Sequence, residues 1–334
     1  MHTGTSYKLS EFLSWTRDLI GVQLLLSATP VILYELAGFR WLAIPWGVAF
    51  LLGTTVALSA GFKNLQTYNR ASEAQQIWAS ITSSSRIWGT LCRDIVGSPL
   101  LARELVYRHI AWLAALRHQM REAKPWEAST KPYNLAYAKR HPAESEPPLA
   151  SELARLVGPD DAARILGASS KAQHVLAMQS SAAKALVDAG TLTPGAFGEL
   201  QKLIRDFHDQ QSRSERIKNF PYPRQHAFIN TLFVRILGVI LPLGMIGEFE
   251  RLNPLVDGWA KGHMVWLGIP LSLTICWMYR ALDRVGESTE NPFEGGANDV
   301  PITSICRGIE ADLRDLLGES RTEPPTRNAS DIAL

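Results

Sequence analysis

Cysteine is scarce in this sequence. Its 334 residues include only three cysteines, Cys92, Cys276 and Cys306. They lie far apart and lack the spacing of metal ligands, so they suggest a reducing compartment. The eight histidines contain no HExxH or comparable ligand spacing. We therefore predict no metal site built on cysteine or histidine.

An excess of charge of either sign is also missing. The formal net charge is +2, which gives no reason to expect a nucleic-acid partner. The N-terminal stretch MHTGTSYKLSEFLSWTRD lacks the pattern of a cleaved signal peptide. No glycine-rich phosphate loop, GxSxG elbow or catalytic cysteine context occurs either, and we predict that the chain is not an enzyme.

The sequence has no alternating strand pattern and no internal repeat, but it does have a long uncharged run. Residues Trp41–Phe62 carry no charged side chain and continue directly into the polar helical sequence KNLQTYNRASEAQQIW. About 20 apolar residues in a helix cross a hydrocarbon core of about 30 Å. The run predicts one helix that leaves a bilayer and continues into water.

Four segments have the length and composition of bilayer helices. They are Leu19–Phe39, Trp41–Phe62, Ala227–Gly247 and Met264–Tyr279. The last is short for a complete span. Each contains a proline, which is tolerated where neighbouring helices or a water-filled cavity satisfy the freed backbone groups. These prolines are Pro30, Pro45, Pro242 and Pro270.

Lysine and arginine flank the spans unevenly. They precede the first and third spans and follow the second and fourth. The positive-inside rule therefore predicts that both termini and the large middle region are cytoplasmic. The resulting all-α layout has five parts. These are an N-terminal part with two spans (1–62), a cytosolic helical domain (63–226), two further spans (227–279), a cytosolic segment (280–318) and a disordered polar tail (319–334).

The middle region has helical periodicity throughout. Apolar residues recur every three or four positions in Ala71–Arg121, and Leu149–Gly167 and Ser170–Gly190 also predict helices. Lys124–Pro148 is rich in proline and small polar residues and predicts a loop. Thr193 followed by Pro194 is a helix-start signal, and that helix should extend to about Asn219.

The second span presents two stripes of interest. One stripe, at a spacing of four residues, consists of Thr54, Leu58 and Phe62. The other has the small-xxx-small spacing that lets helices approach closely, and consists of Gly53, Ala57 and Gly61. In a ring of identical helices the small stripe would pack against neighbours and the apolar stripe would surround an axis, where a narrow ring gates ions by dewetting. Alternatively, Leu58 and Phe62 simply face lipid or a partner helix.

Two further features leave alternatives open. Arg235 lies inside the third span, where it is costly unless paired, and Glu35 or Glu73 are candidate partners; a site for permeating anions is the other interpretation. The segment Gly286–Pro301 is acidic and glycine-rich and offers side-chain oxygens of the kind that calcium binds. It lacks the order of an EF-hand, and such segments are usually solvated turns.

Several segments together resemble the bestrophin family. The run GFKNLQTYNRASEAQQIW…SSSR resembles the family's GF-x-N…Y-x-R…EA…W…SR pattern, and SERIKNFPYP resembles its junction before the third span. FVRILGVILPLGM resembles the R…LP-x-G span, and ENPFEGGANDVPITSICRGIEADL resembles the E-NPF…NDLPL…IE-x-DL segment. The four motifs occur in the family's order from the first span to about Leu317.

The resemblance implies a homopentameric channel in a bacterial inner membrane. Its partners would be the lipid bilayer, copies of the same chain and permeating monovalent ions, either chloride or sodium and potassium. Thr54, Leu58 and Phe62 match the positions of a hydrophobic neck, and Phe197 is the candidate for a second, cytosolic constriction. Thr54 departs from the three large apolar residues usual in the family, which predicts a leakier neck.

The calcium clasp of animal members is degenerate in this sequence. Asn291 and Asp299 remain, but Gly296 stands where a ligating acid would be, so we expect no calcium cofactor. The sign of the conducted ion stays open. Glu248, Glu250 and Asp257 would favour cations if they line the outer mouth. A non-conducting membrane-anchored scaffold or sensor, or a transporter, is the competing interpretation.

Overall fold

The computed structural model describes residues 8–129, 131–135, 147–296 and 298–319. Within these residues every regular element is a helix, in agreement with the predicted all-α class. The chain divides into two compact units. The membrane unit comprises Thr5–Asn69 and Pro221–Glu290, and the helical unit comprises Arg70–Phe220 and the chain from Asn291 onward. Each unit is described by itself.

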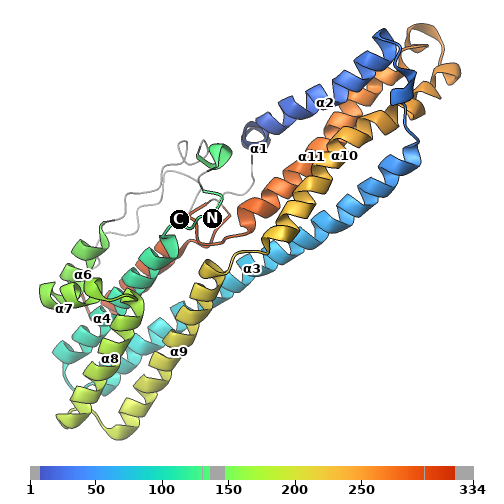
Figure 1. Ribbon diagram of the computed structural model, residues 1–334. Helices are drawn as coiled ribbons and strands as arrows, with labels where there is room; N and C mark the ends of the chain where they lie inside the picture. The colour runs from blue at the N-terminus through green and yellow to red at the C-terminus, as the bar shows by residue number, and fades with distance from the viewer. Residues whose placement is uncertain (1–7, 130, 136–146, 297, 320–334) are drawn as a thin grey trace. The chain divides into compact units, whose positions relative to one another are not determined.

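Long apolar helices form the membrane unit. After the short helix α1 (Leu9–Trp15), these are α2 (Arg17–Leu36), the first part of α3 (Trp46–Ile95), α10 (Arg224–Glu250) and α11 (Gly268–Thr289). Helices α2, α10 and α11 lie side by side (Figure 1). By length and composition the described chain has four candidate membrane spans, which confirms the number predicted.

Two span boundaries differ from the prediction. Helix α3 begins at Trp46 rather than Trp41, because Pro45 restricts the backbone before it and Arg40–Leu42 forms a separate short turn, η1. The fourth span is longer than predicted: the turn η4 (Met264–Leu267) leads into α11, which continues past Tyr279 to Thr289. The prediction ended at Tyr279 because charged residues follow it, but these residues continue the helix. Pro30 and Pro242 lie inside α2 and α10, as predicted.

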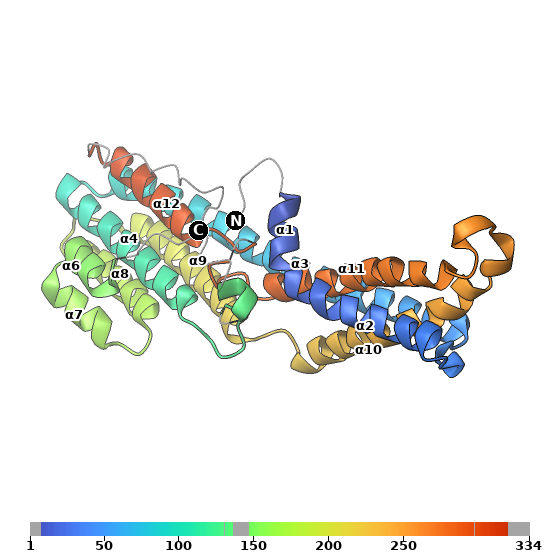
Figure 2. The same cartoon turned by 90° about the horizontal axis from the view of Figure 1, so that it is seen from above.

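The helical unit contains seven longer helical segments in its described part, besides a short one at residues 132–135. They are the second part of α3, α4 (Pro99–Arg121), α6 (Leu149–Val157), α7 (Pro159–Gly167), α8 (Lys171–Asp188), α9 (Pro194–Asn219) and α12 (Ile302–Leu316). Figure 2 shows α4, α8 and α9 running together, with α6 and α7 beside them.

Two predicted helices of this unit are each divided. The stretch Ala71–Arg121 turns at residues 96–98, where Pro99 begins α4. Leu149–Gly167 breaks at Gly158, whose φ of 83° ends α6 before Pro159 begins α7. The start of α9 is confirmed: the Thr193 hydroxyl accepts a hydrogen bond from the backbone amide of Ala196.

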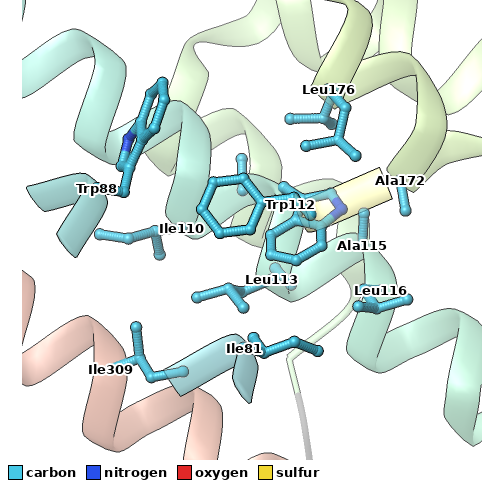
Figure 3. Close-up of a cluster of buried hydrophobic side chains, with 14 of the residues drawn as sticks. Ile81, Trp88, Ile110, Trp112, Leu113, Ala115, Leu116, Ala172, Leu176 and Ile309 are labelled. Atoms are coloured by element: carbon cyan, nitrogen blue, oxygen red, sulfur yellow. The ribbon is translucent and has the colours of Figure 1, made fainter. Parts of the chain in front are cut away.

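Aromatic side chains fill the centre of the helical unit. Trp112 and Phe207 pack with their ring centroids 5.0 Å apart, and the Trp112 Nε1–H donates to Gln211 Oε1 over 2.9 Å. Figure 3 shows Trp88, Trp112 and Ile81 within this cluster. Complete burial lowers the pKa of His109 to about 3, so that ring stays neutral in the core.

Glu319, the first residue of the predicted tail, is bound by two side chains of α4. Glu319 Oε1 accepts a hydrogen bond from Arg103 Nε over 2.8 Å, and Tyr107 donates its hydroxyl to Glu319 Oε2. The disorder predicted for the tail 319–334 stays a prediction. Residues 320–334 lie outside the described residues.

Candidate functional site

Helix α3 has two contrasting faces within the membrane unit. One face is buried and includes Val56, Ala60 and Thr67. Val56 packs against Val234 and Leu237 of α10. These contacts fix the rotation of the helix, since its buried residues follow helical spacing.

The stripe predicted from the sequence lies on the other face. Leu58 and Phe62 are 64% and 58% exposed in the single chain, and Thr54 is exposed on the same side. The regular helix from Trp46 to Ile95 keeps the three residues in one line. The chain therefore presents two large apolar side chains and one threonine on a surface that its own helices leave uncovered.

The hydroxyl of Thr54 is already engaged with its own helix. Thr54 Oγ1 donates to the carbonyl oxygen of Leu51 over 2.9 Å, and the neighbouring Thr55 does the same over 2.9 Å. Such bonds are the usual way in which a threonine satisfies its donor inside an apolar helix. Thr54 thus offers the exposed stripe a methyl group and an acceptor oxygen, but no free donor.

The small residues of α3 have different surroundings. A Cβ at Gly53 would contact Leu237 of α10 at 3.9 Å, whereas one at Gly61 would meet nothing within 4 Å. Ala57 is exposed. In the single chain, only Gly53 of this stripe therefore lies near another helix, and contact between copies of the chain stays a prediction.

A tight approach between α3 and α10 within the membrane unit involves residues that the sequence reasoning did not select. A Cβ at Gly244 of α10 would lie 2.7 Å from the Cβ of Ala49 in α3. Only glycine at this position allows the observed contact between the two helices. The available signal was the glycine in LPLGM, two residues after Pro242.

A buried polar cluster anchors α3 next to Phe62. Lys63 Nζ lies 2.6 Å from Asp283 Oδ1 of α11. The same carboxylate accepts hydrogen bonds from Asn230 and Thr231 of α10, over 2.7 and 3.0 Å. Three helices therefore meet at one satisfied ion pair, which holds this end of the exposed stripe in place.

The acidic residues considered for an outer mouth each have a basic neighbour. Glu248 Oε1 lies 2.9 Å from Arg251 Nη1, and Asp257 Oδ1 lies 3.9 Å from Lys261 Nζ. Glu250 accepts hydrogen bonds from Tyr34 and Arg40. These neighbours partly offset the negative charge that would favour cations if the three acids lined an outer mouth.

The predicted pairing of Arg235 is wrong. Glu73 forms an ion pair with Arg216 within the helical unit. Glu35 lies near Arg40, at the opposite end of the spans, where its charge acts on that guanidinium. Arg235 itself is exposed on α10 and makes no ion pair with any described residue.

Phe197, the candidate for a second constriction, lies in the first turn of α9. Its backbone amide donates to the Thr193 carbonyl oxygen over 3.0 Å, and its half-buried ring packs against the core of the helical unit. The residue is therefore anchored at a helix start, with part of its ring still accessible.

The two acidic side chains of the loop from Asn291 to Asp299 accept several hydrogen bonds. The Asp299 carboxylate accepts hydrogen bonds from the amides of Gly295 and Gly296, over 2.7 and 2.8 Å. Glu294 Oε1 accepts from Asn291 Nδ2 and from the amide of Ala128. Burial raises the pKa of Asp299, and it raises that of Glu294 to about 7.

This donor set does not fit the six to eight oxygens that calcium takes. Gly296 contributes no side chain, one Asp299 oxygen already accepts two amides, and Asn291 uses its NH₂ group inside the loop. The two acids also repel each other while both are buried, which raises the pKa of Glu294 further. The two carboxylates of the loop therefore already accept hydrogen bonds from backbone amides and from Asn291.

A family model decides the relationship of the chain. The model described as bacterial/fungal bestrophin protein matches residues 19–315. The chain belongs to the bestrophin family. This confirms the resemblance carried by the four sequence motifs.

Curated relatives and solved structures agree with this membership. The voltage-dependent anion channel-forming protein YneE of Escherichia coli K12 is 23% identical over 287 residues, covering 86% of this chain and 81% of that protein. A protein of the same description from Mesorhizobium japonicum is 24% identical over 310 residues, with 88% and 87% covered. A bacterial bestrophin homologue from Klebsiella pneumoniae has the same fold, with a TM-score of 0.76, 21% identity and coverage of 91% and 99%.

Proposed function

We propose that this bestrophin forms an ion channel in which copies of the chain surround one central pore. The observation that carries the proposal is the exposed stripe of α3. Leu58 and Phe62 are large, apolar and uncovered, while the opposite face of the same helix is packed against α10. A ring of such stripes would form a narrow apolar passage of the kind that gates by dewetting.

The assembly is proposed to be a homopentamer, with Thr54, Leu58 and Phe62 as its neck. Exposed small residues at Ala57 and Gly61 beside the stripe support close packing between copies. The mass of the purified particle tests this part. Five chains of 37.0 kDa are expected from native mass spectrometry in detergent, and a monomer or dimer under the same conditions would contradict the assembly.

The conducted ion is proposed to be a monovalent anion. The relatives in Escherichia coli and Mesorhizobium japonicum are named as anion channel-forming proteins. The basic neighbours of Glu248, Glu250 and Asp257 weaken the charge argument for cations. The reversal potential in asymmetric potassium chloride tests the sign, and a potential near that of potassium would contradict it.

Single-channel recording in planar bilayers tests the neck. Leu58→Ala or Phe62→Ala should raise conductance or open probability, because smaller side chains widen and wet the passage. Leu25→Ala is a matched control, since Leu25 on α2 is 69% exposed and apolar but lies outside the stripe. Unchanged currents in both stripe variants would contradict the neck.

The loop from Asn291 to Asp299 is proposed to work without bound calcium. Its two carboxylates already accept hydrogen bonds from backbone amides and from Asn291, as described above. Currents should therefore be the same in micromolar calcium and in chelator. Activation by calcium that disappears in Asp299→Ala would contradict this part alone.

A further inference from the structure

A layer of ion pairs marks one end of the membrane unit. Arg284 of α11 holds Asp18 of α2 with two hydrogen bonds, of 2.8 and 2.6 Å. Asp283 is bound by Lys63, Asn230 and Thr231. Both acids of the layer therefore already have partners within the protein.

Two arginines lie one helical turn farther into the membrane-spanning part. Arg280 precedes Arg284 by four residues in α11, and Arg235 follows Thr231 by four residues in α10. The helices are antiparallel, since Asp283 contacts Asn230 while Cys276 contacts Leu237. Moving one turn, about 5.4 Å, backward along α11 and forward along α10 therefore leads away from the ion pairs in the same direction. Arg280 and Arg235 thus lie at a similar depth in the membrane unit.

No described acidic side chain pairs with either arginine. Both arginines lie between the two contacts that join α10 to α11, Asp283 with Asn230 and Cys276 with Leu237. Asp18 is held bidentately by Arg284. The enclosed Nη1 of Arg280 has no hydrogen-bond partner among the described residues.

The surroundings of Arg235 are those of a lipid-facing surface. Phe228, Leu232 and Val239 share its side of α10 and are exposed. A charged group within an apolar stripe is costly unless an anion or water reaches it, and arginine side chains extend toward the headgroup region to find one. Guanidinium groups match phosphate oxygens in geometry as well as in charge.

We propose that Arg235 and Arg280 bind the phosphate group of an anionic phospholipid, in the leaflet on the side of the Asp18–Arg284 pair. The phosphate would accept hydrogen bonds from the exposed Arg235 and would offset the two unpaired charges. This site lies outside the α3 stripe. The lipid proposal requires only that the chain spans a membrane. Its test therefore does not depend on whether the chain conducts ions.

Lipid retention measured by native mass spectrometry tests the site. The full chain is purified in detergent and titrated with phosphatidylglycerol or phosphatidylcholine of identical acyl chains. Wild type should bind phosphatidylglycerol more tightly, and Arg235→Gln and Arg280→Gln should each weaken that binding about tenfold. Arg280→Lys, which retains the charge but not the fork of donors, should weaken it less.

Arg251→Gln is the matched control, because Arg251 follows the other end of α10 and pairs with Glu248. Equal binding of the two lipids by wild type, or equal losses in Arg251→Gln and Arg280→Gln, would overturn the proposal. Inorganic phosphate added alone should not displace the lipid at millimolar concentration; if it does, the site binds a free anion instead. Arg235→Gln could instead lower the mass of the oligomer and leave lipid binding unchanged. That result would assign Arg235 to a contact between copies of the chain and would also overturn the lipid proposal.

Discussion

At the residue scale, one hydroxyl distinguishes the proposed neck from a fully apolar one. Thr54→Val removes that hydroxyl while keeping the shape of the side chain, and it leaves a stripe of three apolar residues. We expect lower conductance, because a ring without acceptor oxygens is harder to wet. Thr55→Val is the control: Thr55 makes the same bond to Leu51 but lies off the stripe. Equal effects of the two substitutions would show that the bond to the helix, rather than the stripe, is responsible.

A second residue, Glu294, should make the stability of the helical unit depend on pH. Burial raises its pKa from 4.5 to about 7 in the folded protein. The protonated form is thus favoured by folding, so the stabilisation is complete below pH 4.5 and is lost as the pH rises through about 7. We expect the thermal midpoint to fall over this range, by an amount corresponding to roughly 1–2 kcal/mol for a partly exposed group.

Glu294→Gln should flatten that pH dependence, because the amide oxygen still accepts from Asn291 and Ala128 but carries no charge. Glu199→Gln serves as the control, since Glu199 is exposed on α9 and pairs with Lys202. Thermal unfolding of both variants between pH 4.5 and 8 makes the comparison. A profile of Glu294→Gln that parallels wild type would refute the role of this carboxyl.

At the scale of elements, the contact between α3 and α10 depends on a missing side chain. Gly244→Ala would place a methyl group 2.7 Å from that of Ala49. We expect the overpacking to lower the free energy of unfolding by about 1–3 kcal/mol. Ala49→Gly in the same chain should restore part of the loss, whereas Gly21→Ala on α2, where a Cβ meets nothing within 4 Å, should be near neutral. Chemical unfolding in detergent measures these three variants beside the wild type.

Local signals account for the elements that the sequence predicted well. Four spans follow from hydropathy alone, and Thr193 with Pro194 predicts the start of α9 because the cap and the fixed φ act within one turn. The breaks near Gly158 and residues 96–98 were missed, because helical periodicity continues across a single turn. The partner of Asp283 was not predictable either, since Lys63 lies 220 residues away and only packing brings them together.

At the candidate site, too, local features could be predicted from the sequence, whereas contacts between distant residues could not. Helical spacing correctly placed Thr54, Leu58 and Phe62 on one face, because a spacing of four residues is a property of the helix alone. Which of the two faces is buried depends on α10, whose Val234 and Leu237 contact Val56. The pairing proposed for Arg235 failed for a related reason: Glu73 belongs to the other unit and is bound there by Arg216.

At the scale of the whole molecule, the exposed stripe faces either water or lipid, and its accessibility distinguishes the two. The three native cysteines are free and buried, so a cysteine introduced on the surface can be labelled in an otherwise unchanged chain. In a channel, Leu58→Cys lines a passage and should react with a charged, water-soluble thiol reagent, which then blocks the current. Leu25→Cys, at a comparably exposed position on α2, should not change the current when treated. If the reagent leaves the current of Leu58→Cys unchanged while open channels are recorded, the stripe faces lipid or a neighbouring helix, and the pore must be sought on another surface.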